Sequence, residues 1–117
     1  YFYVAETEEQ AFNDTREHLN WVIDVMQWRR NIESGSEVYR RIGEWRDTRT
    51  ELPATYEYLT TNRAIIGTPE QCLEKIMSLR KEGIEYFGCN FDFGGISHSK
   101  VMKSMKLFSE KVMPTLT

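Results

Sequence analysis

Residues 64–71, Ala-Ile-Ile-Gly-Thr-Pro-Glu-Gln, constrain the fold of this chain more than any other stretch. A short apolar run ends at Gly67. Thr68 then has a side chain that can cap a helix, Pro69 fits the first helical position, and Gln71 completes a Thr-x-x-Gln capping box. An extended run that passes directly into a capped helix is typical of α/β folds.

The helix that begins here has a clear apolar stripe and a clear end. Cys72, Ile76 and Leu79 recur at helical spacing, and Gly83 can end the helix in a left-handed conformation. A second apolar run over residues 86–93 predicts a strand, which the pair Gly94-Gly95 ends with a turn. The order helix, strand, turn is therefore expected for this part of the chain.

The last segment, residues 97–113, predicts one more amphipathic helix, and Pro114 is expected to end it. We expect this helix to pack through four apolar positions: Val101, Met105, Phe108 and Val112.

The start of the chain predicts a strand followed by a long helix. Residues 1–5 are aromatic and β-branched, as in a strand, and Thr7 with Gln10 forms another capping box. The helix should run to about Asn31. Its apolar stripe consists of Phe12, Leu19, Val22, Ile23 and Met26.

The pattern weakens over residues 33–62. Ser34-Gly35-Ser36 interrupts it, residues 38–45 suit a short helix, and residues 56–59 suit one more turn. A long irregular stretch inside an α/β unit is usually a functional lid or a disordered segment. The pattern of residues 33–62 alone leaves both alternatives open.

Composition excludes several classes of protein. A chain of 117 residues suits one domain, and its net charge of −3 gives no electrostatic case for binding nucleic acid. No apolar run approaches the roughly 18 residues that a membrane helix needs, so we expect no membrane contact and a cytoplasmic location. Cys72 and Cys89 both lie in apolar stretches and are expected to be buried free thiols, with a disulfide or a reactive thiol as the alternatives. No cluster of Cys and His has the spacing of metal ligands.

The predicted strand has two different faces, because side chains alternate along a strand. One row is apolar and should lie under helices: Phe87, Cys89, Phe91 and Phe93. The other row contains Tyr86, Gly88, Asn90 and Asp92. In a (β/α) barrel this second row would point inward, with Asn90 and Asp92 near the carboxyl end of the strand, where such barrels place their active sites.

Three motifs in order resemble the bacterial luciferase-like flavin-dependent monooxygenases. These are Gly67-Thr68-Pro69-Glu70 at a helix start, residues 90–95 (Asn-Phe-Asp-Phe-Gly-Gly) at a strand end, and residues 104–108 (Ser-Met-Lys-Leu-Phe) leading to Val112-Met113-Pro114. The resemblance is strong over residues 64–116 and weaker over residues 1–31.

The resemblance implies the C-terminal portion of a (β/α)8 TIM-type barrel, incomplete as an isolated chain. We expect a single partial domain over residues 1–117, with strand and helix in 1–32, the lid in 33–62, and the barrel end in 63–117. Family members use reduced FMN, or a deazaflavin in some branches, and dioxygen to oxidise a small organic substrate. A flavin reductase would supply the reduced flavin.

The resemblance also implies which residues form the site. Asp92 and His98 are the predicted catalytic residues, and the predicted cofactor-binding residues are Asn90, Gly94, Gly95 and Trp21. Each has a structural alternative. Asp92 can bond the amides of the glycine turn or pair with a nearby arginine, and Gly94 and Gly95 can serve turn geometry alone. His98 can be a solvated residue at a helix start, and Trp21 an ordinary core or interface residue. Four arginines of the predicted lid can touch a phosphate or form a solvated face: Arg40, Arg41, Arg46 and Arg49.

A second function class remains open from sequence. Half a barrel leaves strand edges and apolar faces uncovered, so the chain is expected to form a homo-oligomer or to associate with the missing N-terminal part. The alternative to an enzyme is thus a non-catalytic α/β module that binds a partner through its sheet edges.

Overall fold

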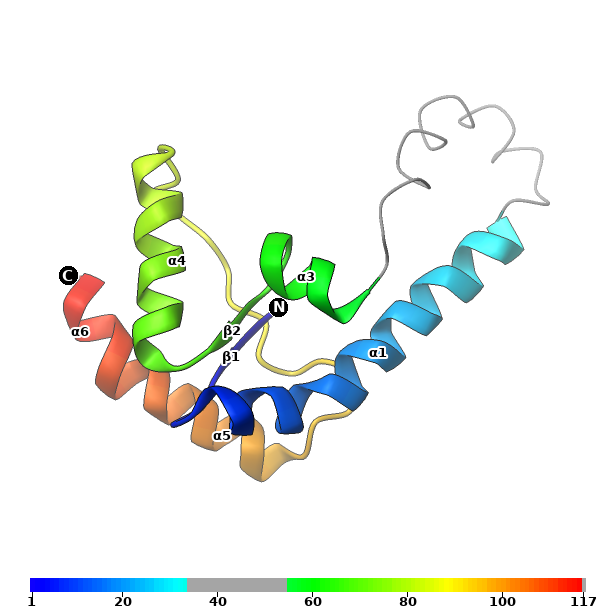
Figure 1. Cartoon of the computed structure of the whole chain (residues 1–117), viewed down its shortest axis with the longest axis horizontal. Helices are drawn as coiled ribbons and strands as arrows, with labels where there is room; N and C mark the ends of the chain where they lie inside the picture. The colour runs from blue at the N-terminus through cyan, green and yellow to red at the C-terminus, as the bar shows by residue number, and fades with distance from the viewer. Residues whose placement is uncertain (34–54, 117) are drawn as a thin grey trace.

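The computed structural model describes residues 1–33 and 55–116 of the chain, and this part is a mixed α/β structure (Figure 1). Its sheet has two short parallel strands, β1 (Phe2–Val4) and β2 (Ile65–Gly67). Phe2 pairs with Ile65 and Val4 with Gly67. The strand predicted at residues 1–5 is therefore confirmed, and so is the extended run that was predicted to lead into the helix at residues 64–67.

Helices surround this small sheet. In chain order they are α1 (Glu8–Glu33), α3 (Tyr56–Asn62), α4 (Pro69–Lys81) and α5 (His98–Leu107), followed by a π-helical turn (Phe108–Val112) and α6 (Met113–Leu116). None of the helices within the described ranges is long and apolar enough to cross a membrane.

The predicted start and end of α4 are confirmed. The Thr68 hydroxyl accepts a hydrogen bond from the Gln71 amide, and the Gln71 side chain accepts one from the Thr68 amide. Pro69 occupies the first turn. Gly83 follows the helix with a φ of 92°, the left-handed conformation that glycine adopts at least cost.

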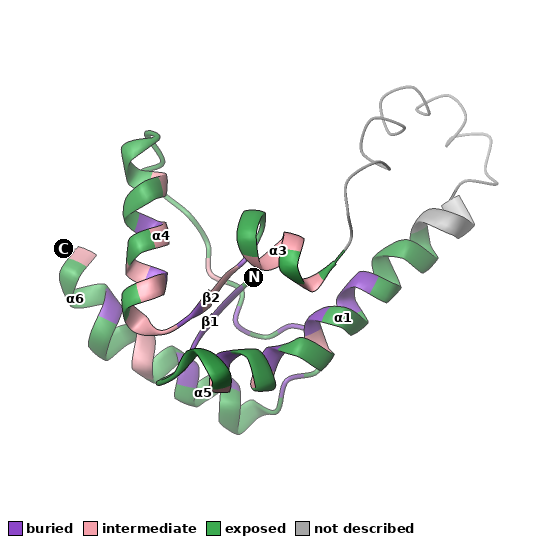
Figure 2. Cartoon of the chain, viewed as in Figure 1, coloured by how far each residue is buried: buried purple, intermediate pink, exposed green. Residues whose placement is uncertain are grey.

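Helix α1 packs on β1 through residues spaced along one face, including Ala11, Thr15, Leu19 and Val22, all of them buried. Ile23 is buried as predicted, but the prediction was wrong for Phe12 and Met26, which are exposed. The outer part of α1 extends past the sheet (Figure 1), and its residues 24–29 are exposed (Figure 2). Helical periodicity marks one face of a helix but not how far along that face the sheet reaches.

The strand predicted over residues 86–93 is absent; these residues form an extended segment with no regular secondary structure. One backbone hydrogen bond, from the Phe2 amide to the Asn90 carbonyl, joins this segment to β1. The Phe91 ring lies against Phe2, and the Phe93 ring lies against Tyr1, before β1 begins. The segment therefore reaches the amino-terminal end of β1, whereas a parallel barrel strand would bring its last residues beside Val4.

The predicted apolar row of this segment is only partly buried. Phe91 and Phe93 are buried and Cys89 is half-buried, but Phe87 is exposed, which contradicts its predicted burial. Phe91 closes an aromatic cluster with Phe2 and Phe108, whose ring centroids lie 5.0–5.6 Å apart. This cluster joins β1, the extended segment and the C-terminal helix in one core.

The C-terminal helix differs from its prediction in two respects. Val101 and Val112 are buried, but Met105 is exposed and Ser104 takes the buried position beside it. Pro114 does not end the helix, which continues to Leu116. A π-helical turn, in which the Met113 amide bonds the Phe108 carbonyl, interrupts the usual ladder just before Pro114, so the missing amide hydrogen of proline costs less there.

Most of the predicted lid lies outside the described residues. This includes the short helix predicted at residues 38–45 and the four arginines Arg40, Arg41, Arg46 and Arg49. The turn predicted at residues 56–59 is confirmed as part of α3, which Thr55 caps by accepting a hydrogen bond from the Tyr58 amide.

Candidate functional site

The turn formed by Gly94 and Gly95 is the best-defined feature near the predicted site. Both glycines have positive φ, 59° and 76°, and the Ile96 amide donates to the Phe93 carbonyl across the turn. Two successive residues with positive φ are typical of a turn that favours glycine. Turn geometry alone is therefore sufficient to explain why both positions are glycine.

The glycine turn is fixed to α1 by His18. The Nδ1 atom of His18 lies 2.7 Å from the Gly94 carbonyl oxygen. A Cβ atom placed on Gly94 would lie 2.1 Å from the His18 carbonyl oxygen, so only glycine fits against the helix here. No local signal in the sequence marks His18 as a site residue, because its partner lies 76 residues further along the chain.

The predicted polar residues around the turn all face solvent. Asn90, Asp92 and His98 are exposed, and within the described part of the chain no side-chain hydrogen bond or ion pair involves them. The structure therefore does not place the Asp92 carboxylate on the amides of the turn. Because residues 91–93 lie beside the start of β1, Asp92 is not at the carboxyl edge of β1 and β2 either.

Trp21 projects from α1 with 58% of its surface exposed, one helical turn after His18. The structure thus brings Trp21 near the residue that holds Gly94. It does not bring Asn90, Asp92 and His98 into contact with Trp21.

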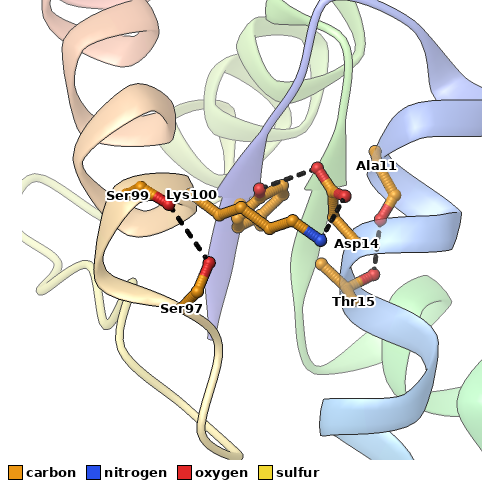
Figure 3. A network of polar contacts seen from close by, with 7 residues as sticks. Ala11, Asp14, Thr15, Ser97, Ser99 and Lys100 are labelled. Atoms are coloured by element: carbon orange, nitrogen blue, oxygen red, sulfur yellow. Dashed lines mark hydrogen bonds and ion pairs between the residues drawn. The ribbon is translucent and has the colours of Figure 1, made fainter.

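A polar network joins β1, α1 and α5 (Figure 3). The hydroxyl of buried Tyr3 donates to one carboxylate oxygen of Asp14 at 3.0 Å, and the Lys100 ammonium lies 3.1 Å from the other. Burial, and then the hydrogen bond to Asp14, raise the pKa of Tyr3 well above its ordinary value. Tyr3 is therefore a neutral hydrogen-bond donor at physiological pH, and the network orients the start of α5 against α1.

Two buried hydroxyl groups, those of Ser104 and Thr15, form hydrogen bonds that join neighbouring elements. Ser104 accepts a 2.8 Å hydrogen bond from the Val4 amide, which has no strand beside it on that edge. The Thr15 hydroxyl donates to the Ala11 carbonyl, so the hydroxyl of Tyr56, 2.9 Å away, donates to Thr15. The first contact closes an edge of β1, and the second fastens α3 to α1.

Both cysteines are free, as predicted. Cys72 is fully buried and its thiol donates to the Tyr3 carbonyl, while Cys89 is half-buried. Burial raises the pKa of Cys72 to about 12 and also raises that of Cys89. Neither thiol is a thiolate at neutral pH, so neither is an activated nucleophile.

We expect the buried thiol of Cys72 to make stability fall as pH rises above about 9. The unfolded chain ionises this thiol near its ordinary pKa of 9.0, whereas the folded chain keeps it protonated up to about 12. The folded state therefore binds the proton more tightly, and each pH unit in this window costs up to about 1.4 kcal/mol. Urea unfolding of the parent chain and of Cys72→Ala at pH 7, 9 and 10 measures this. The stability difference between the two should change by about 0.4 kcal/mol from pH 7 to 9 and by about 1 kcal/mol more from pH 9 to 10. Parallel pH profiles would contradict the assignment.

The predicted cofactor residues do not form a flavin pocket by themselves. Hollows of about 520, 670 and 620 Å³ open on the described part of the molecule, and none of the three is lined by Asn90, Gly94, Gly95 or Trp21. The first lies at the amino-terminal end of the two strands, with Arg63 and Lys75 beside Tyr1, Ile65 and Phe87. The side chains of the described ranges also contain no group of three or more potential metal ligands. A flavin site would therefore need walls beyond these residues.

The chain is similar in sequence to known monooxygenases. No protein-family model and no solved structure matches it. It is 30% identical over 106 residues to the alkanal monooxygenase alpha chain of the Kryptophanaron alfredi symbiont, and 32% identical over 107 residues to that of Photobacterium leiognathi. The alkanal monooxygenase alpha chain of Photorhabdus laumondii is 28% identical over 106 residues.

These matches cover 90% of the chain but only 25–26% of each relative, so the chain spans about a quarter of their length. Sequence similarity to three alkanal monooxygenase alpha chains thus confirms the resemblance of this chain to the bacterial luciferase-like flavin-dependent monooxygenases.

Proposed function

We propose that this chain is the C-terminal part of a luciferase-like flavin-dependent monooxygenase with a (β/α)8 barrel. The observation that carries the proposal is the similarity to alkanal monooxygenase alpha chains over 90% of this chain and about a quarter of theirs. The chain would supply one wall of the barrel and the lid over its mouth.

The small size of the sheet supports the proposal that this chain is part of a larger barrel. Parallel sheets are normally covered on both faces and contain more strands, and a two-stranded sheet is marginal by itself. Here β1 and β2 have three residues each, and the segment where a third strand was predicted leaves Tyr86 93% exposed. Further strands would give this segment the hydrogen-bonding partners that it lacks.

The proposed reaction uses reduced FMN, or a deazaflavin, and dioxygen to oxidise a small organic substrate, with a flavin reductase as the source of reduced flavin. An alkanal is the first substrate to test, because the relatives are alkanal monooxygenases. When bound, the flavin supplies the redox chemistry, and the protein orients the substrate and excludes water. Asp92 is proposed to position a ligand and His98 to donate a proton. We further propose a cytoplasmic enzyme that assembles as a homo-oligomer or with its N-terminal part.

The enzyme proposal is tested on the full-length gene product that contains this chain. The purified protein is mixed with photoreduced FMN, air-saturated buffer and decanal, and formation of the corresponding carboxylic acid is followed with and without aldehyde. Aldehyde-dependent product supports the proposal. A full-length protein that neither binds FMN nor oxidises any alkanal, but captures a partner through its sheet edges, supports the non-catalytic module instead.

We predict that the isolated 117-residue chain binds FMN weakly, with a Kd well above micromolar. The predicted cofactor residues line none of the three hollows, and the main phosphate anchors are expected outside this chain. Quenching of flavin fluorescence on titration with the chain measures the affinity. Trp21→Ala serves as a control, because a real ring contact would make that variant weaker still. A stoichiometric yellow complex with sub-micromolar affinity would contradict the prediction.

A further inference from the structure

We propose that His18 is a positioning residue that holds the Gly94–Gly95 turn and, through it, sets the positions of Asp92 and His98. The link between His18 and the reaction rests on the proposed function. The hydrogen bond from His18 to the turn rests on geometry alone. His18 lies on α1, far from the turn in sequence, and its Nδ1 atom is 2.7 Å from the Gly94 carbonyl oxygen.

The contact fixes the state of the imidazole ring. A carbonyl oxygen only accepts hydrogen bonds, so Nδ1 must carry the hydrogen, in the neutral ring as well as in the cation. The neutral ring is therefore the Nδ1–H tautomer, with its lone pair on Nε2. Within the described part of the chain Nε2 has no hydrogen-bond partner. The bond to Gly94 thus sets both the orientation of the ring and the position of its free nitrogen.

Buried Phe93 and Ile96 anchor the two sides of the glycine turn, but few backbone hydrogen bonds hold the turn itself. Residues 86–93 have no strand ladder, and one backbone hydrogen bond ties them to β1. Glycine has the greatest conformational freedom of any residue, and Gly95 is exposed with open space around it. Besides the bond between Ile96 and Phe93, the turn is held by His18, whose backbone also limits Gly94 by direct contact.

The turn lies between the two predicted catalytic residues. Asp92 precedes Gly94 by two residues, and His98 follows it by four as the first residue of α5. A shift of the turn would move the end of the extended segment and the start of α5 together. Lys100, in the same first turn of α5, is separately held by Asp14 of α1. His18 therefore completes a two-point attachment of this corner to α1.

The bond is tested by NMR on the 117-residue chain. The 15N shifts of the His18 ring should show a protonated Nδ1 and an unprotonated Nε2 at high pH. His18→Asn keeps a donor near the position of Nδ1, whereas His18→Gln carries its amide near Nε2. Hydrogen exchange at Ile96, whose amide bonds the Phe93 carbonyl across the turn, should speed up about tenfold in His18→Gln and His18→Ala, the change expected for one lost hydrogen bond, and stay within about twofold in His18→Asn. Glu17→Gln, next to His18 on α1 and exposed, is the matched control.

The same variants in the full-length enzyme test the link to the reaction. We expect kcat/KM to fall about tenfold in His18→Gln and to recover in His18→Asn. An Nε2–H tautomer, or equal exchange in the Asn and Gln variants, would overturn the positioning role whether or not the enzyme proposal holds. Changed exchange with unchanged kcat/KM would show that His18 holds the turn but not the site. Absence of any activity in the parent enzyme would reject the proposed function while leaving the NMR result to stand or fall by itself.

Discussion

Phe91→Ala should lower the free energy of unfolding by about 3–5 kcal/mol, the usual cost of emptying a large aromatic core site. Phe91 is 8% exposed and its ring lies 5.2 Å from that of Phe2 and 5.6 Å from that of Phe108. Truncation would remove contacts to β1 and to the C-terminal helix at once. Urea unfolding followed by circular dichroism measures the loss.

Phe87→Ala is the matched control for this experiment. It removes the same atoms from the same segment, but Phe87 is 37% exposed and lies outside the aromatic cluster. We expect a cost below about 1.5 kcal/mol for Phe87→Ala, since much of its surface is already in water. A loss below about 1 kcal/mol for Phe91→Ala would show that the cluster does not hold the extended segment.

Sequence alone predicted the elements whose causes are local. The capping box of Thr68 and Gln71 and the left-handed Gly83 depend on residues within a few positions of each other. Both were therefore visible in the chain and are confirmed. The same holds for the strand at β1, whose aromatic and β-branched residues favour extended backbone.

Sequence failed where an element depends on distant partners. Residues 86–93 have the alternation of a strand, but a strand also requires neighbours that supply a ladder of hydrogen bonds, and here only the Phe2 amide does so. Alternation still predicted the burial of Phe91 and Phe93. It could not predict that Ser104, a polar residue, would be buried. The Ser104 hydroxyl accepts a hydrogen bond from the Val4 amide, which has no strand beside it and lies at the other end of the chain.

In the candidate site too, features with local causes could be predicted and features with distant partners could not. The glycine pair indicates a turn by its own composition, whereas His18 becomes visible only when the chain folds α1 against that turn. Asp92, Asn90, His98 and Trp21 remain predictions from the resemblance, since none of the three hollows described above is lined by them. Their roles depend on walls that this chain would share with the rest of a barrel.

Gly94→Ala should destabilise the chain by about 3–5 kcal/mol, for two reasons that add. The residue has a φ of 59°, which costs any residue with a Cβ atom, and that Cβ would lie 2.1 Å from the backbone oxygen of His18. The obstacle is helix backbone, which cannot rotate aside as a flexible side chain can. The turn must therefore move away from α1, and the hydrogen bond from His18 to the Gly94 carbonyl is lost with it. Thermal and urea unfolding measure the total loss.

Gly95→Ala separates the two causes, because Gly95 has a φ of 76° but no atom within 4 Å of the position that a Cβ would take. It should cost only the strain of the left-handed backbone, about 1 kcal/mol. The excess cost of Gly94→Ala over Gly95→Ala then measures the contact with α1. That excess should shrink in a His18→Ala background by the value of the lost hydrogen bond, about 1 kcal/mol, because the steric part comes from the helix backbone and remains. Equal costs for the two glycine variants would mean that the turn does not lie against α1, and that His18 cannot hold it.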